Sequence, residues 1–310
     1  MDLEKNKKYA HGKDGLRAVR AEQRNLGEVQ RWASAALLRV GVDEARRESE
    51  LMVSHLIGAS VGALYLRRDE PVSDEQFVQL KGWVERRGHR EPLYYILGEC
   101  EFWSLPFKVA PAVLIPRPET ELLVEEGLGF LKTVQVENPL VLDLCTGSGC
   151  VAVSIARDFQ AARVYGSDIS ENAVVLAREN AALNDQERVE FFVGDLFEAV
   201  SDLSLKGRFD LIVSNPPYIP EGDIGGLQKE VATHEPRAAL DGGADGLVII
   251  CRIVKDAPAF LKAGGKLILE VGFDQGGHVA AILQESGFFT DVKVRKDYSG
   301  IERIVSARRI

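Results

Sequence analysis

The feature that most constrains the fold of this chain is a short apolar run that passes directly into a glycine-rich turn. Residues 140–144 have the pattern of a buried strand, and Gly147 and Gly149 follow in a G-x-G-x-x-A arrangement that is expected to open a helix. Glycine permits the tight geometry of such a turn and lets a ligand approach the helix N-terminus. The run therefore predicts the first strand, turn and helix of a parallel α/β sheet with a ligand at its edge.

Two further predicted strands lead into an aspartate. Residues 163–169 place Asp168 about twenty residues after the turn, the spacing expected for an acid that binds ribose hydroxyls. Residues 189–193 lead to Asp195, which could accept a hydrogen bond from an adenine amino group. Ligands of open α/β sheets bind at the carboxyl ends of the strands, so both aspartates are expected in one site with the glycine turn.

A fourth predicted strand ends in Asn215-Pro216-Pro217-Tyr218. An amide or planar amine nitrogen is a poor nucleophile while its lone pair is conjugated, so its methylation requires acceptors for its hydrogens. The Asn215 side-chain oxygen and the Pro216 carbonyl can be those acceptors, and proline adds no competing N–H. Tyr218 offers a flat face on which an amide or a base can stack. The structural alternative is a strand that ends in a Pro-Pro turn with a surface tyrosine.

The identity of the cofactor follows from this motif rather than from the glycines. Nicotinamide and flavin enzymes share the glycine turn, whereas Asn-Pro-Pro-Tyr has no role in hydride chemistry. The combination favours S-adenosyl-L-methionine. Asp143, three residues before the turn, would suit the ammonium group of such a cofactor, or it could simply bond the turn.

No metal site is predicted. The chain has four cysteines without a C-x-x-C pair and five scattered histidines. Cys145 and Cys150 flank the turn and are interpreted as small packing residues rather than as ligands or a disulfide.

The charge and hydropathy of the chain exclude other classes of function. A net charge of −9 argues against tight, non-specific binding to nucleic acid, which depends on neutralising phosphates. No apolar stretch approaches the roughly eighteen residues of a membrane span, and the N-terminus lacks a signal-peptide core. A cytoplasmic protein is expected.

Two types of pattern divide the chain. Residues 26–99 show helical periodicity, with Ser73 opening a capping box and Asp43 able to cap an earlier helix. Later residues alternate strands and helices, and an apolar, proline-containing hairpin is expected between the two regions. After the hairpin, a helix is expected to start near Glu119. Beyond Tyr218 the pattern predicts a long lid-like loop (219–246), a helix (247–261), a strand (265–271), a helix (275–285) and strands near Val292 and Ile304.

Several motifs together resemble the peptide chain release factor glutamine methyltransferases, the PrmC or HemK family. Asn-Pro-Pro-Tyr alone would also fit adenine methyltransferases. What narrows the resemblance is Arg-Pro-Glu-Thr-Glu joined to a helical N-terminal region and a glycine turn of this form. The resemblance covers most of residues 26–310, and the matching motifs lie at residues 91–98, 101–103, 115–121, 143–149 and 215–218.

The resemblance implies a class I S-adenosylmethionine-dependent methyltransferase fold, which is Rossmann-like with a seven-stranded, mostly parallel sheet carrying one antiparallel strand. It also implies a small helical N-terminal domain and a connecting β-hairpin. The corresponding segments are a disordered leader (1–25), a helical substrate-recognition domain (26–99), the hairpin (100–118) and the methyltransferase domain (119–310).

The implied reaction is methylation of the side-chain amide nitrogen (N5) of the glutamine in the Gly-Gly-Gln motif of class 1 peptide chain release factors. The family often has an aromatic residue after Asp195, where this chain has Leu196, so aliphatic contact with the adenine is expected. The acceptor glutamine is expected to be held by Asn215, Pro216, Pro217 and Tyr218, with Asn215, Pro216 and Tyr218 as catalytic residues. The cofactor is expected to be held by Cys145, Thr146, Gly147, Ser148, Gly149, Asp168, Asp195, Leu196 and Asn215.

Three alternatives remain at this point. One is methylation of a glutamine in a ribosomal protein, and another is N6-adenine methylation of nucleic acid, which should require a basic groove. The third is a cofactor-binding scaffold without catalysis. Arg117, Glu119, Thr120 and Glu121 are expected either to line the active site or only to fix the hairpin.

Overall fold

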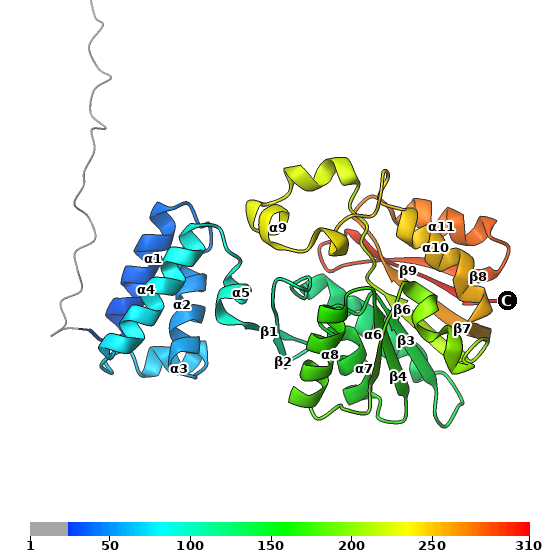
Figure 1. Cartoon of the computed structure of the whole chain (residues 1–310), viewed down its shortest axis with the longest axis horizontal. Helices are drawn as coiled ribbons and strands as arrows, with labels where there is room; N and C mark the ends of the chain where they lie inside the picture. The colour runs from blue at the N-terminus through cyan, green and yellow to red at the C-terminus, as the bar shows by residue number, and fades with distance from the viewer. Residues whose placement is uncertain (1–23) are drawn as a thin grey trace, which may run out of the picture. The chain divides into compact units, whose positions relative to one another are not determined.

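The computed structural model describes residues 24–310, which divide into two units on either side of the Leu97–Gly98 bond (Figure 1). The predicted leader, residues 1–25, lies outside the described residues except for Arg24 and Asn25. Asn25 is the N-cap of the first helix, and its side chain accepts a hydrogen bond from the Glu28 backbone N–H.

The first unit is helical, as its periodicity predicts, and is built around one apolar cluster. The predicted capping box is confirmed, because the Ser73 hydroxyl and the Gln76 side chain each accept the other's backbone N–H. The predicted cap at Asp43 is wrong: Glu44 is the N-cap of its helix, without a side-chain cap hydrogen bond. The helices are α1 (Leu26–Arg39), α2 (Ala45–Leu56), α3 (Val61–Leu66), α4 (Asp74–Gly88) and α5 (Leu93–Leu97).

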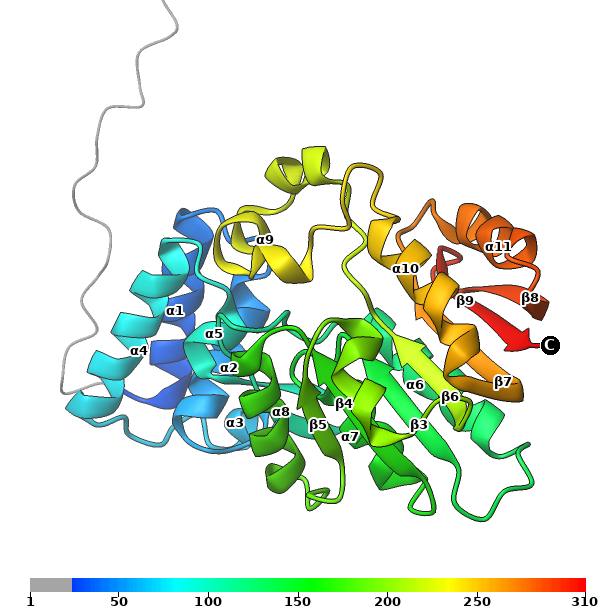
Figure 2. The same ribbon diagram turned by 45° about the vertical axis from the view of Figure 1, so that its right-hand side comes forward.

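The second unit contains a small hairpin and a seven-stranded sheet of order β5-β4-β3-β6-β7-β9-β8 (Figures 1 and 2). All neighbouring strands from β5 to β7 are parallel, and β9 runs antiparallel to both of its neighbours. This is the sheet that the resemblance implies. The strands are β1 (Glu99–Phe102) and β2 (Leu105–Lys108) of the hairpin, then β3 (Leu140–Leu144), β4 (Arg163–Asp168), β5 (Glu190–Val193), β6 (Phe209–Ser214), β7 (Leu261–Glu270), β8 (Phe289–Lys296) and β9 (Glu302–Arg309).

Helices cover both faces of this sheet, which explains why its central strands are apolar throughout (Figure 2). Leu142 and Ile212 belong to the core on one face, whereas Leu211 and Val213 lie against the helix that contains Gly127 on the other. The first face packs against η3 (Leu196–Leu203), α10 (Val248–Asp256) and α11 (Gly276–Glu285), and the second against α6 (Glu121–Leu131), α7 (Cys150–Asp158) and α8 (Glu171–Leu183).

Some predicted boundaries are wrong for local reasons. The predicted helix at 247–261 ends at Asp256, because Pro258 lies in a short 3-10 turn, η6 (Ala257–Ala259), and proline cannot continue an α-helix. Strand β7 begins at Leu261, earlier than predicted, since Leu261 pairs with Phe209 across a register shift. The hairpin strands end at Lys108, well before residue 118, and α6 follows a 3-10 turn, η2 (Pro118–Thr120).

The segment predicted as a long loop, residues 219–246, is folded into short helices. Its two ends meet, because the Ile219 N–H donates to Leu240 and the Gly242 N–H donates to the Ile219 carbonyl, at 3.0 and 2.9 Å. The segment is therefore a closed excursion from the end of β6. It contains η4 (Glu221–Gly226), α9 (Lys229–His234) and η5 (Arg237–Ala239).

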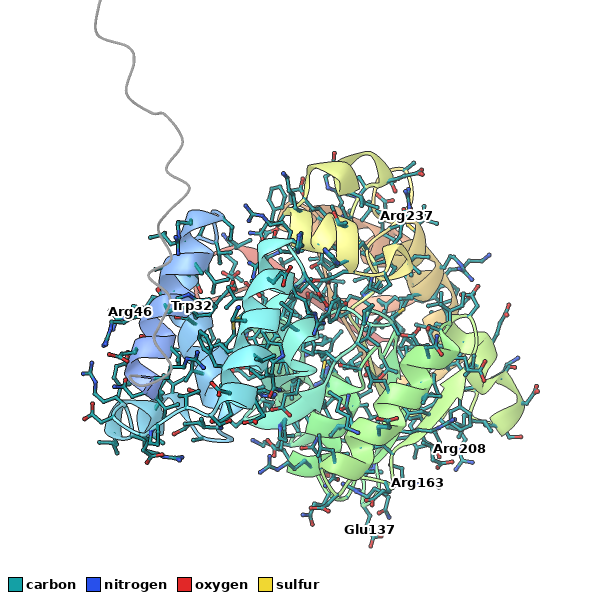
Figure 3. The ribbon with its side chains drawn as sticks, turned by 60° about the vertical axis from the view of Figure 1, so that its left-hand side comes forward. Trp32, Arg46, Glu137, Arg163, Arg208 and Arg237 are labelled. Atoms are coloured by element: carbon teal, nitrogen blue, oxygen red, sulfur yellow. The ribbon has the colours of Figure 1, made fainter. Side chains whose placement is uncertain are left out.

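The excursion lies beyond the carboxyl ends of the parallel strands. In Figure 3, Arg237 marks the excursion at one end of the second unit, and Glu137, Arg163 and Arg208 lie together at the other end. Arg163 is the first residue of β4 and Arg208 directly precedes β6, so this second group marks the amino ends of the strands. The excursion therefore lies at the carboxyl ends of the parallel strands and not at their amino ends.

Asn180 of α8 connects the hairpin to the glycine turn. It is fully buried, its side-chain oxygen accepts the Lys108 N–H at 2.7 Å, and its amide group donates to the Lys108 and Ser148 carbonyls at 3.0 and 2.9 Å. One side chain therefore satisfies three backbone groups from two distant segments.

Replacing Asn180 with alanine is expected to lower the free energy of unfolding of the second unit by about 3 kcal/mol, since it removes three hydrogen bonds of a fully buried side chain and leaves the buried Ser148 carbonyl without this partner. Chemical denaturation monitored by circular dichroism measures the change. Asn138→Ala, in the exposed loop before β3, is the matched control and should stay within about 0.5 kcal/mol of the unmodified protein. Equal midpoints for the two variants would contradict this role of Asn180.

Candidate active site

The predicted glycine turn connects β3 to α7 and has left-handed backbone at three positions. Cys145, Gly147 and Gly149 have φ values of 57°, 53° and 81°. A Cβ on Gly149 would lie 3.0 Å from the Ala177 side chain and 3.2 Å from Phe191, so both its backbone angle and its surroundings require glycine. The turn is thereby packed directly against α8 and β5.

Asp143 is bonded within the turn. Its Oδ2 accepts the Thr146 hydroxyl at 2.6 Å and the Ala152 N–H at 3.2 Å, and its side chain is 1% exposed. Burial raises the pKa of Asp143 to about 7, against the lowering effect of these two donors. Of the two sequence-based interpretations of Asp143, these contacts favour the turn-bonding one, although Asp143 also lines the cavity described below.

Asp168 faces the same turn from the end of β4. Its Oδ2 accepts the Gly147 N–H and its Oδ1 accepts the Ser170 N–H, both at 2.9 Å. Burial raises the pKa of Asp168, while these backbone donors oppose that shift. Each carboxylate oxygen has two acceptor sites, so the carboxylate is fixed in place and can still accept hydrogen bonds from a diol.

Asp195 and Leu196 lie at the end of β5, as predicted, but Asp195 already has a partner. Arg252 of α10 donates to the Asp195 Oδ2 at 2.7 Å, and both residues are partly exposed. Leu196 has a φ of 51° and is 8% exposed, with its side chain in the core cluster that also contains Phe197. The sequence did not indicate that Arg252 binds Asp195, because Arg252 reaches this position from a helix 57 residues away.

The Asn-Pro-Pro-Tyr motif begins directly after β6, next to the glycine turn. The pairing of Leu144 with Ser214 places the two connections side by side, and the Ser214 hydroxyl donates to the Leu144 carbonyl at 2.8 Å. The Asn215 Nδ2 donates to the Thr120 hydroxyl oxygen at 3.1 Å. The amide group of Asn215 is therefore oriented by a residue of η2.

Tyr218 is held at both ends. Its hydroxyl donates to the Glu270 Oε1 at 3.4 Å, and its backbone carbonyl accepts the Gln275 Nε2 at 2.9 Å. Burial raises the pKa of the Tyr218 phenol well above its usual value. Its ring packs against the core cluster of the sheet.

A cavity of about 300 Å³ joins most of the predicted site residues. Asn215 and Pro217 line it, whereas Gly149, Pro216 and Tyr218 are not among its lining residues. All of its lining residues belong to the second unit. Those predicted from the sequence are Cys145, Thr146, Gly147, Ser148, Asp168, Asp195, Leu196, Asn215 and Pro217.

Two further segments line this cavity, and the sequence left the role of the first of them open. Residues 112–120 contribute Arg117 and Thr120, and the excursion contributes Pro236, Ala238 and Ala239. Arg117 forms an ion pair of 2.6 Å with Glu235, whose carboxyl is buried and has a raised pKa as a result. This pair joins the two segments next to the cavity, which Arg117 lines.

The alternatives left open for residues 117–121 are separated by these contacts. Arg117 and Thr120 line the cavity. Glu121 instead accepts the Trp103 backbone N–H at 2.8 Å and so belongs to the hairpin, while Glu119 is exposed. Within the Arg-Pro-Glu-Thr-Glu motif, Arg117 and Thr120 therefore lie at the cavity and Glu121 at the hairpin.

Within residues 24–310, no group of three or more His, Cys, Asp and Glu side chains is arranged to hold a metal ion. No helix in the same range is long and apolar enough to cross a membrane.

Comparison with known proteins gives the family of the chain. Residues 28–98 match the family described as the PrmC N-terminal domain, and residues 123–235 match the one described as the methyltransferase small domain. The release factor glutamine methyltransferase of Geobacter sulfurreducens is 44% identical over 283 residues, which cover 91% of this chain and 96% of that protein. The chain belongs to the release factor glutamine methyltransferase family.

Other members of the family are similar over almost the same length. The protein of the same name from Thermodesulfovibrio yellowstonii is 40% identical, covering 84% of this chain and 91% of that protein, and the one from Rhodospirillum rubrum is 42% identical, covering 92% and 85%. The chain is thus an S-adenosylmethionine-dependent methyltransferase with the class I fold.

Proposed function

We propose that this enzyme methylates the side-chain amide nitrogen (N5) of the glutamine in the Gly-Gly-Gln motif of a class 1 peptide chain release factor. The observation that carries the proposal is the orientation of Asn215 at the cavity. Because its Nδ2 donates to Thr120, its Oδ1 is left as an acceptor for a substrate N–H. Members of its family, at 44% and 40% identity, are named for this type of reaction.

The residues around the cavity fit S-adenosylmethionine. The Asp168 carboxylate is fixed by two backbone donors and retains acceptor sites for the ribose hydroxyls, and the glycine turn lies beside it. Asp195 and Leu196 are proposed for the adenine, with Cys145, Thr146, Ser148 and Gly149 completing the turn. When bound, the cofactor supplies an electrophilic methyl group on a sulfonium.

The residues of Asn-Pro-Pro-Tyr are proposed to orient the acceptor. The Asn215 Oδ1 and the Pro216 carbonyl accept hydrogen bonds from the two hydrogens of the glutamine amide. Tyr218 and Pro217 fix the position of the amide plane. The amide nitrogen becomes positively charged as it is methylated, so these acceptor dipoles stabilise the transition state more than the neutral ground state. The main contribution is orientation of the nucleophile.

Two segments are proposed to select the protein substrate. These are the helical domain of residues 26–99 and the excursion of residues 219–246, which we propose acts as a lid. A release factor substrate also fits the cytoplasmic location expected from the sequence, since translation termination takes place there. With a net charge of −9, nucleic acid is not proposed as a substrate.

The proposal is tested by incubating the purified enzyme with radiolabelled S-adenosylmethionine and a class 1 release factor. A copy of the release factor with alanine in place of the Gly-Gly-Gln glutamine is the control, and mass spectrometry locates the label. We expect label on the first substrate only, on the side-chain nitrogen. Equal labelling of both, or labelling of ribosomal protein or nucleic acid instead, would overturn the proposal.

A further inference from the structure

A second cavity lies within the first unit, and the proposed reaction gives it no role. It has a volume of about 500 Å³, and its lining residues lie between residues 27 and 68. Its three arginines are Arg31 of α1, Arg46 of α2 (Figure 3) and Arg68, which follows α3. We propose that this arginine pocket binds an acidic segment of the protein substrate. The inference rests on the proposed function, because it takes a release factor as that substrate.

The pocket is basic although the chain as a whole is acidic. Among the described residues that line it, Glu50 is the only acid, and its Oε1 accepts the Arg46 Nε at 3.0 Å and the Tyr65 hydroxyl at 2.6 Å. No side-chain hydrogen bond or ion pair joins Arg31 or Arg68 to another described residue. Three arginines and one glutamate give the pocket a formal charge of +2, whereas the chain has a net charge of −9.

The backbone places the two arginines without a counter-ion on the same face of α1. The Gly27 N–H donates to the Arg68 carbonyl at 2.8 Å, so the chain after α3 is held against the first turn of α1. A Cβ on Gly27 would lie 3.5 Å from the Arg68 Nε, which places the Arg68 side chain over this glycine. Arg31 is four residues after Gly27, and residues at that spacing share a helix face. One ligand can therefore contact both guanidinium groups.

The lining of the pocket fits a peptide that carries carboxylates. A guanidinium presents parallel N–H donors that match the two oxygens of a carboxylate. The pocket also has apolar lining residues, of which Leu64 is buried and Leu38 is 67% exposed. A small inorganic anion would leave Leu38 uncovered, whereas a polypeptide segment can supply apolar and acidic side chains together.

Other occupants are opposed by their charge. Residues 1–23 of this chain contain six Lys and Arg against four Asp and Glu, so their net charge has the same sign as that of the pocket. Nucleic acid would bring phosphates next to Glu50, and the net charge of −9 opposes its approach to the protein. Charge complementarity favours an acidic segment of another protein.

The test reverses the two charges that lack a counter-ion, in the variant Arg31→Glu/Arg68→Glu. We expect the KM for the release factor to rise about 10- to 50-fold because the new carboxylates repel the acidic segment, while kcat and the Kd for S-adenosylmethionine change by less than about twofold. Arg39→Glu/Arg47→Glu is the matched control, since it makes the same change in net charge on α1 and α2 at residues that do not line the pocket. The KM of this control should stay within about threefold of that of the unmodified enzyme.

The salt dependence of KM separates an electrostatic role from a structural one. Dissolved ions screen interactions between exposed charges, so the KM of the unmodified enzyme should rise at least about threefold between about 50 and 300 mM NaCl. The KM of Arg31→Glu/Arg68→Glu should fall over the same range, because salt then screens a repulsion. If this variant does not fold, as judged by its thermal unfolding, Arg31→Gln/Arg68→Gln takes its place. That variant should have a KM raised about 3- to 10-fold and almost independent of salt.

Cross-linking identifies the occupant of the pocket. Ser34 lines the pocket one turn after Arg31, and p-benzoylphenylalanine in place of Ser34 can be photolysed in the presence of the release factor. We expect mass spectrometry to locate the adduct in a release factor segment that contains at least two Asp or Glu residues. Replacing those residues with lysine should bring the KM of Arg31→Glu/Arg68→Glu to within about threefold of that of the unmodified pair.

Several outcomes would overturn the inference while leaving the proposed function intact. They are equal KM values for Arg31→Glu/Arg68→Glu and its control, a loss confined to kcat or to cofactor affinity, and an adduct with residues 1–23 of the enzyme, with nucleic acid or with a segment without acidic residues. Failure of the unmodified enzyme to label any release factor is a different result, because it overturns the proposed function itself.

Discussion

Asn215→Ala is expected to reduce kcat for release factor methylation by about 100-fold or more. The variant removes the proposed acceptor for the glutamine amide, and loss of a single oriented transition-state contact typically costs this much. The cavity is otherwise unchanged, so the Kd for S-adenosylmethionine should change by no more than about threefold, although Asn215 also lines it. Single-turnover methylation and calorimetric titration of the cofactor measure the two quantities.

The matched control for this prediction is Asn138→Ala, which removes an amide from an exposed loop at the amino end of β3. It should retain the turnover of the unmodified enzyme. Near-normal turnover of Asn215→Ala would refute the orientation role of Asn215. A large loss of cofactor affinity would assign Asn215 to cofactor binding instead.

Asp168→Ala is expected to have its main effect on the cofactor, raising the Kd for S-adenosylmethionine by about 100-fold. Hydrogen bonds from hydroxyls to a carboxylate contribute about 1.5–3 kcal/mol each, and the variant also leaves the Gly147 and Ser170 N–H groups without their acceptor. Calorimetric titration measures this affinity, and kcat at saturating cofactor should fall by less than about tenfold.

Asp168→Asn gives a finer version of the same test, since it keeps the shape and one acceptor oxygen and should have an intermediate affinity. Asp69→Ala, at an exposed position of the first unit, is the control and should bind the cofactor normally. If Asp168→Ala binds the cofactor as well as this control, the ribose role of Asp168 is wrong.

Local signals predicted much of the fold and part of the site. The buried strands, the glycine turn and the capping box at Ser73 each depend on neighbouring residues, and all are present. Some local signals predicted the wrong residue. Asp43 is a good capping residue by type, but Glu44 is the N-cap and the helix starts after it. Pro258 ended a helix that periodicity alone extended to residue 261.

The contacts that complete the cavity could not be predicted because they join distant segments. Arg117 pairs with Glu235 across 118 positions, and Asn215 bonds Thr120 across 95. The sequence shows that such residues can form ion pairs or hydrogen bonds, but only the folded chain brings particular partners together. The same is true of Asn180, because neither its residue type nor its sequence neighbours indicate that it joins the hairpin to the glycine turn.

The closed base of the excursion allows the sequence of the excursion to change without a change in the arrangement of the neighbouring strands. Since Ile219 is hydrogen-bonded to both Leu240 and Gly242, the chain leaves and rejoins the second unit at almost the same point. Sequence changes, insertions or deletions between these residues need not alter the spacing of β6, which Asn215 directly follows, and β7. In evolution or in engineering, the parts of this segment that do not line the cavity can therefore vary in length and sequence while the end of β6 stays in place.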